Sequence, residues 1–94
     1  MDNKEISCIC TVLEEIRGFS SISEFERFQK YINGLIDDGE LIEISVRKRY
    51  AGFPEQWYKC KSCALIWRLV HPDFPFKGLW LKVERSAEYV IKHN

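Results

Sequence analysis

Two pairs of cysteines are the residues of this sequence best suited to chemistry. Cys60 and Cys63 stand three positions apart within the stretch WYKCKSCALIW, and Cys8 and Cys10 stand two positions apart near the start. Structural zinc sites are tetrahedral and take four thiolate or imidazole ligands. A Cys-x-x-Cys pair at the end of a hairpin has the form of one zinc knuckle, so Cys60 and Cys63 offer two of the four ligands that zinc needs.

The spacing of the first pair argues against its joining the same metal. Apolar residues at helical intervals predict a helix from Glu5 to about Arg17. Side chains two apart on a helix point roughly 200° away from each other. Cys8 and Cys10 could then face one metal only if the chain entered the helix after Cys10.

The two histidines are also poorly placed to complete the site. His71 lies eight residues past Cys63, roughly 20 Å or more along an extended strand, and His93 is next to the last residue. A thioredoxin-like redox pair would need a helix after the cysteines, whereas a strand is expected there. We therefore interpret Cys60 and Cys63 as small residues at a turn and expect no cofactor, with zinc at this pair as the alternative.

Signatures of catalysis are absent from the sequence. It contains no glycine-rich phosphate loop and no Gly-x-Ser-x-Gly motif, and two histidines give little material for a general base. The consecutive acids Asp37 and Asp38 fall at an expected helix end, where such residues usually meet solvent. We expect that the protein is not an enzyme.

The elements that position these residues change character halfway along the chain. A second helix is predicted to begin at a capping box of Ser23 and Glu26, and to end at Gly39. The pattern then favours strands at 41–50, 57–60, 64–70 and 79–84, with an irregular proline loop between the last two. Residues 86–94 form either a short helix or a frayed tail. The expected fold is α+β, with two N-terminal helices packed on a small, mostly antiparallel sheet of three or four strands.

Length and composition limit the classes of protein to consider. Ninety-four residues form a single domain, 1–94. No apolar run approaches the roughly 20 residues of a membrane helix, and the start does not resemble a signal or transit peptide. We expect a cytoplasmic protein without a membrane partner, in which cysteines are thiols or metal ligands rather than disulfides.

Charge is balanced overall but divided between the two halves. Residues 1–46 hold ten acids and four bases, a net charge of −6, and residues 47–94 have a net charge of +6. Such a division concerns partners more than fold. It also fits two halves that simply attract each other within one domain.

A resemblance to a known family is carried by the block CKSCALIWRLVHPDFPFKGLW. Its pattern resembles small bacterial immunity proteins of contact-dependent growth inhibition and related polymorphic-toxin systems, and covers about a quarter of the chain. The matching residues are Cys60, Cys63, Trp67, Leu69, Pro72, Asp73, Pro75, Phe76, Gly78 and Trp80. The resemblance implies a cytosolic protein that binds one cognate toxin, often a nuclease, and blocks its active site. Immunity proteins against nucleases are commonly acidic overall, and this chain departs from that pattern.

Two surfaces could meet a partner under these hypotheses. An anionic surface suits a toxin with a cationic active site, and the candidate residues are Glu14, Glu15, Asp37, Asp38, Glu40 and Glu43. The alternative function is a zinc-knuckle module for single-stranded nucleic acid, in which basic side chains neutralise phosphates and aromatic rings stack on bases. Its candidate residues are Arg47, Lys48, Arg49, Tyr50, Trp57, Tyr58, Lys59 and Lys61.

Overall fold

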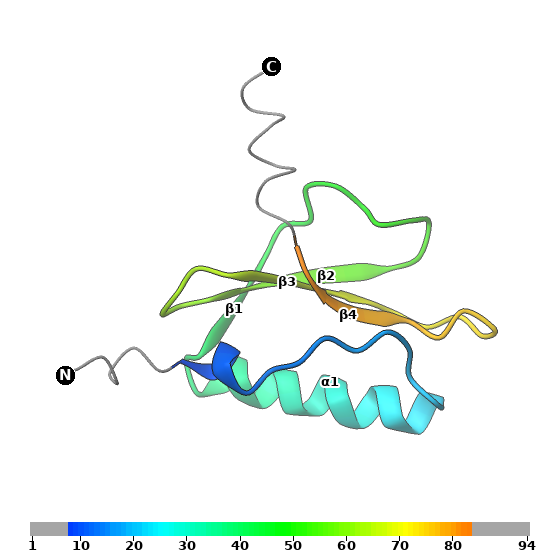
Figure 1. Cartoon of the computed structure of the whole chain (residues 1–94), viewed down its shortest axis with the longest axis horizontal. Helices are drawn as coiled ribbons and strands as arrows, with labels where there is room; N and C mark the ends of the chain where they lie inside the picture. The colour runs from blue at the N-terminus through cyan, green and yellow to red at the C-terminus, as the bar shows by residue number, and fades with distance from the viewer. Residues whose placement is uncertain (1–7, 84–94) are drawn as a thin grey trace, which may run out of the picture.

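A computed structural model describes residues 8–83, which form one helix and one sheet (Figure 1). Helix α1 lies across one face of the sheet, and the chain before it runs alongside α1 toward strand β4. No helix in residues 8–83 has the length and apolar character to cross a membrane. In chain order the elements are a short 3-10 turn η2 (Ile9–Thr11), α1 (Ile22–Asp37), β1 (Leu41–Ile44), β2 (Glu55–Cys60), β3 (Ile66–Val70) and β4 (Leu79–Lys82).

The sheet is a simple antiparallel meander of four strands in the order β1-β2-β3-β4. Each strand pairs with the next one along the chain, which short connections allow only in antiparallel sheets. The expected α+β class with a small antiparallel sheet is therefore confirmed. The 41–50 strand is shorter than expected and ends at Ile44.

The expected first of two N-terminal helices is wrong. The part of that range inside the described region holds only η2, and the chain then runs on to β4, where Ile16 and Trp80 exchange two backbone hydrogen bonds of 2.8 Å. The amide of Phe19 also donates to Lys77 O. The physical reason is that β4 would otherwise leave a row of unpaired backbone groups at the sheet edge. Pairing with that edge outweighs the helical spacing of the apolar residues.

Helix α1 begins two residues earlier than the sequence predicted. Ser21, not Ser23, is the N-cap, and its hydroxyl accepts a hydrogen bond from the amide of Glu24. The Glu24 carboxylate accepts in turn from the amide of Ser20. The predicted box of Ser23 and Glu26 therefore lies inside the first turn. The correct pair follows the same Ser-x-x-Glu rule.

The end of α1 is a Schellman motif around Gly39, close to where the sequence placed it. The amide of Gly39 donates to Ile36 O, and the amide of Glu40 donates to Leu35 O. Gly39 has φ +81°, a conformation in which glycine avoids the strain of a side chain. The motif turns the chain directly into β1. The predicted tail at 86–94 lies outside the described residues.

The core between α1 and the sheet is built mainly from aromatic rings. Trp67 and Trp80 stack with centroids 5.0 Å apart and an interplanar angle of 9°. Phe28 from α1 meets Trp80 edge-on, also at 5.0 Å. Both tryptophans and Tyr58 are almost completely buried. Such pairs add to the large apolar area that each ring removes from water.

The opposite face of the sheet is covered in part by the loop between β1 and β2, which arches over it (Figure 1). A buried carboxylate, Glu55, holds this arrangement together. It accepts hydrogen bonds from the Tyr50 amide at 2.8 Å and from Trp57 Nε1 at 2.6 Å. It also pairs with Arg68 Nε at 3.2 Å, and Arg68 donates to Lys48 O in the loop. The Tyr50 amide and the Lys48 carbonyl that take part in these contacts would lie within the strand if β1 continued to residue 50.

Candidate metal centre

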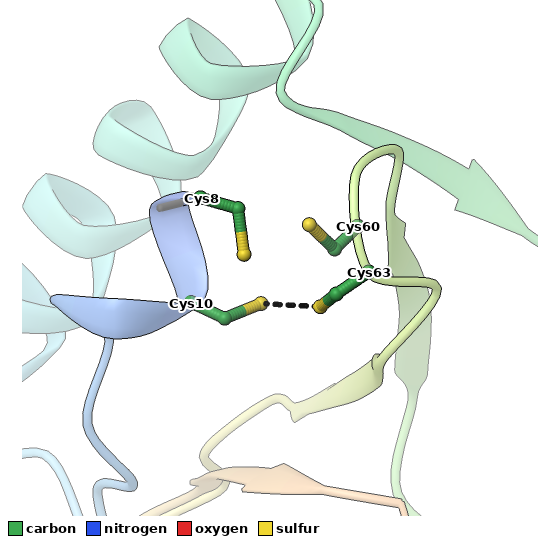
Figure 2. A group of neighbouring side chains, drawn as sticks. All are labelled: Cys8, Cys10, Cys60 and Cys63. Atoms are coloured by element: carbon green, nitrogen blue, oxygen red, sulfur yellow. Dashed lines mark hydrogen bonds between the residues drawn. The ribbon is translucent and has the colours of Figure 1, made fainter. Parts of the chain in front are cut away.

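Four cysteine sulfurs from two distant parts of the chain meet at one point beside the end of the sheet. Cys8 and Cys10 come from the N-terminal segment, Cys60 is the last residue of β2, and Cys63 lies in the turn between β2 and β3. Figure 2 shows all four side chains directed into a common space. Their Sγ atoms all lie within 4.8 Å of one another, and the Cys10 and Cys63 sulfurs are 3.7 Å apart.

The distances between these sulfurs match a single tetrahedral metal ion. With zinc–sulfur bonds of about 2.3 Å, the sulfurs of a tetrahedral site are about 3.8 Å apart. A disulfide would bring two sulfurs to about 2.05 Å, and all four cysteines are free thiols. Four thiolates favour zinc among the common divalent ions. The residues present therefore fit a zinc ion, which they would surround completely.

The turn after β2 positions the second pair. The Cys60 amide donates to Leu65 O and the Ala64 amide donates to Cys60 O, both at 2.9 Å. Ala64 adopts φ +67°, which closes the turn and returns the chain into β3. The backbone amides of Ser62 and Cys63 point at the Cys60 sulfur. This geometry is that of the zinc knuckle considered from the sequence.

The first pair reaches the same point because its segment is not an α-helix. Cys8 is extended, with φ −129° and ψ 176°, and Cys10 follows within η2. The turn is fixed by Thr11, whose amide and hydroxyl both donate to Cys8 O, at 3.0 and 2.9 Å. The expectation that Cys8 and Cys10 point away from each other assumed an α-helix. It does not hold for an extended residue followed by a tight turn. The four-ligand requirement is met without a histidine.

Two of the sulfurs, those of Cys10 and Cys60, accept hydrogen bonds that would stabilise a thiolate. Trp67 Nε1 donates to Cys10 Sγ at 3.4 Å. Burial works to raise the pKa of Cys60, but hydrogen bonds from the Cys63 and Ser62 amides and from neighbouring thiols outweigh it, so the pKa is lowered. Donors aimed at a ligating thiolate spread its charge and hold it in orientation.

Cys8 and Cys10 resist ionisation when no metal is present. Burial raises the pKa of Cys10 to about 12, assisted by the nearby Cys63 and Cys60 and opposed by the hydrogen bond from Trp67. A hydrogen bond from the Cys10 amide acts to lower the pKa of Cys8. Burial and the neighbouring thiols of Cys63 and Cys60 together outweigh it, so the pKa of Cys8 is raised. Several thiolates packed together would repel one another, and only a cation at the centre removes that repulsion.

His71 has a separate role in the structure. Its Nε2 atom lies 2.9 Å from Gln56 Oε1, and its ring packs on Phe25 with centroids 5.0 Å apart. Burial lowers its pKa. The expectation that His71 would not join the cysteines agrees with this placement, and His93 lies outside the described residues.

The acidic residues proposed to meet a partner fall in two places. Glu14 and Glu15 lie in the segment before α1, and Glu15 is engaged by Arg17 at 3.2 Å and by the Lys82 amide at 3.1 Å. The others follow one another from the end of α1 into β1: Asp37, Asp38, Glu40 and Glu43. Among these four, Glu43 accepts a hydrogen bond from Gln56 Nε2 at 3.3 Å. We call Asp37, Asp38, Glu40 and Glu43 the acidic run.

The aromatic residues considered for nucleic-acid stacking are mostly inaccessible. Trp57 and Tyr58 are each 1% exposed, and the Arg68 guanidinium lies 5.3 Å from the centre of the Trp57 ring. Tyr50 is about half exposed, but the same guanidinium lies 5.7 Å from its ring centre. Stacking needs rings with a free face, so these side chains offer little platform for bases.

Comparison with known proteins adds no relative: no family model, curated protein or solved structure matches this chain. The metal site is therefore inferred from the geometry of the four cysteines alone. Sequence reasoning considered all four cysteines but did not group them. The available signal was a Cys-x-Cys pair and a Cys-x-x-Cys pair in one short chain, which together supply the ligand number of a structural zinc site.

Proposed function

We propose that this chain is a small zinc-binding module in which four cysteines hold a structural metal ion, and that the module acts by binding another macromolecule. The observation that carries the proposal is the meeting of the four sulfurs within 4.8 Å. Two of them come from the segment before α1 and two from the far end of a hairpin. A metal at this point would tie the N-terminal segment to the sheet.

The ligand set supports a structural rather than a catalytic role for the metal. Catalytic zinc sites keep one coordination position for water or substrate, whereas sites with four protein ligands are closed. Here four thiolates would occupy every position. The proposed module is accordingly not an enzyme, and its surface would carry the function.

Metal content provides the test. Protein purified under reducing conditions and reconstituted with zinc is expected to hold about one zinc ion per chain by elemental analysis. Cys60→Ser should lose most of this zinc. Ser62→Ala is the matched control, because Ser62 lies in the same turn and is not a ligand, and it should keep the zinc. A wild-type chain that takes up no zinc after reduction would overturn the proposal.

For the partner we propose a cognate toxin protein with a cationic surface, blocked by the acidic run. Asp37 and Asp38 are exposed, and no ion pair joins them to another residue within 8–83. Unpaired carboxylates on a scaffold held by its metal would accelerate association with a positive partner and select for it. The resemblance of residues 60–80 to immunity proteins points to the same class of partner.

Binding measurements would separate this partner from nucleic acid. The probe is the protein encoded next to this gene, or single-stranded oligonucleotide at low salt. Changing the acidic run together to Asn and Gln should weaken toxin binding by about tenfold or more, while Lys59→Gln with Lys61→Gln should leave it unchanged. The opposite result, with oligonucleotide binding that is lost in the lysine variant, would favour the nucleic-acid alternative.

A further inference from the structure

The four cysteines differ in their exposure to solvent, so a small oxidant would reach some of the sulfurs before others. Cys63 is exposed, Cys8 and Cys10 are partly exposed, and Cys60 is fully buried. Oxidation of cysteine by small oxidants follows exposure and thiolate character. A peroxide approaching from solvent would therefore meet the Cys63 sulfur first.

The Cys63 sulfur lies in hydrogen-bonding contact with a sulfur from the other segment. Cys10 Sγ lies 3.7 Å away, and a dashed line joins the two sulfurs in Figure 2. Cys10 belongs to the N-terminal segment and Cys63 to the turn between β2 and β3. A bond between these two sulfurs would join the same two segments that a metal would join.

We propose that Cys10 and Cys63 form a peroxide-sensitive pair, whose oxidation expels the metal and replaces the metal cross-link by a disulfide. The inference rests on the proposed zinc site. It adds a modification site and a second chemical state of the cross-link. The sequence argued against a thioredoxin-like redox pair of Cys60 and Cys63. The pair proposed here, Cys10 and Cys63, is a different one.

The chemistry takes two steps and uses hydrogen peroxide as the oxidant. The Cys63 thiolate attacks one peroxide oxygen and the O–O bond breaks, which leaves a sulfenic acid and a hydroxide that takes up a proton. The Cys10 thiolate then attacks the Cys63 sulfur, the S–S bond forms and the S–O bond breaks, and the hydroxide again leaves as water. Two electrons pass from the sulfurs to the peroxide oxygens. A zinc ion held by the four cysteines would lose two of its ligands and be released.

The two segments stay connected through this exchange. Loss of the metal alone would free Cys8 and Cys10 from the turn, whereas the disulfide keeps Cys10 attached to it. Contacts that do not involve sulfur also remain, including the two hydrogen bonds between Ile16 and Trp80. The oxidised, metal-free chain should thus stay folded and lose its zinc without losing its architecture.

A pair of single-ligand variants tests the proposal. Zinc-loaded full-length wild type is treated with hydrogen peroxide in the presence of a colorimetric zinc chelator, and metal-free wild type, Cys63→Ser and Cys8→Ser are treated in parallel to follow disulfide formation. Both variants lose one ligand, but only Cys63→Ser loses the exposed sulfur of the pair. Peptide mapping should find the Cys10–Cys63 disulfide in wild type and in Cys8→Ser. Peroxide should be consumed about tenfold more slowly by Cys63→Ser.

The outcomes distinguish this inference from the zinc proposal beneath it. A wild-type chain that binds no zinc overturns the proposed function, and mapping of its oxidised form still decides whether Cys10 and Cys63 pair. A chain that binds zinc but forms a different disulfide, or that carries sulfinic acid at Cys63 without a disulfide, overturns the inference alone. Zinc release in step with the Cys10–Cys63 bond supports both.

Discussion

Removing the metal is the perturbation with the largest expected effect on stability. The metal would close a loop between residues that are 53 positions apart, as measured from Cys10 to Cys63. By the chain-entropy relation for a cross-link, a loop of that length stabilises the folded state by about 4 kcal/mol. For a domain of this size, that corresponds to a fall in melting temperature of roughly 15–30 °C.

The assay is thermal unfolding of zinc-loaded protein with and without a strong chelator, under reducing conditions. Cys60→Ser should melt near the chelated wild type, and chelator should change it little. Ser62→Ala should behave like wild type. Equal melting temperatures with and without chelator, in protein that demonstrably holds one zinc, would refute the reasoning that the metal carries the cross-link.

Three further predictions concern protons released on metal binding, the ion pair between Glu55 and Arg68, and a turn that requires glycine. Burial and neighbouring thiols raise the pKa of Cys8 and Cys10, so zinc must displace at least two protons when it binds. The affinity for zinc should therefore rise about a hundredfold per pH unit near neutrality, as measured by competition with a zinc indicator. Glu55→Ala removes a fully buried carboxylate and leaves the Arg68 side chain, 16% exposed, without its ion-pair partner, which should cost about 3–5 kcal/mol in urea unfolding, whereas Gln56→Ala should cost far less. Gly78→Ala places a methyl group 2.9 Å from Val70 O at φ +79° and should cost about 1–3 kcal/mol or more, whereas Gly52→Ala, with no neighbour within 4 Å, should change stability little.

Most of the strands and α1 could be predicted because their signals are local. Alternation between apolar and polar residues predicted the strand at 41–50, of which β1 is the first part, and Gly39 marked the helix end. The start of α1 was misplaced because Ser21 and Ser23 both satisfy the same capping rule with a glutamate three residues later. Local chemistry does not distinguish two overlapping boxes.

The metal centre could not be assembled from the sequence because it depends on a contact between distant segments. The apolar residues before α1 fit a helical period, yet Leu13, Ile16 and Phe19 instead contribute to the core from an irregular segment that bonds to β4. That edge is more than 60 residues further along the chain. Once the segment is not helical, Cys8 and Cys10 can face one point. The incorrect prediction of a first helix is therefore also the reason why Cys8 and Cys10 were not predicted as ligands.

The hydrogen bond from Trp67 to the Cys10 sulfur gives the molecule an optical readout of its own centre. Trp67 also stacks on Trp80, so the two indoles share one rigid, chiral environment. Changing Cys10 from thiol to metal-bound thiolate or to disulfide alters the electron density beside that indole. Intrinsic tryptophan emission and near-ultraviolet dichroism should consequently follow the state of the sulfurs in real time, with no dye or label attached.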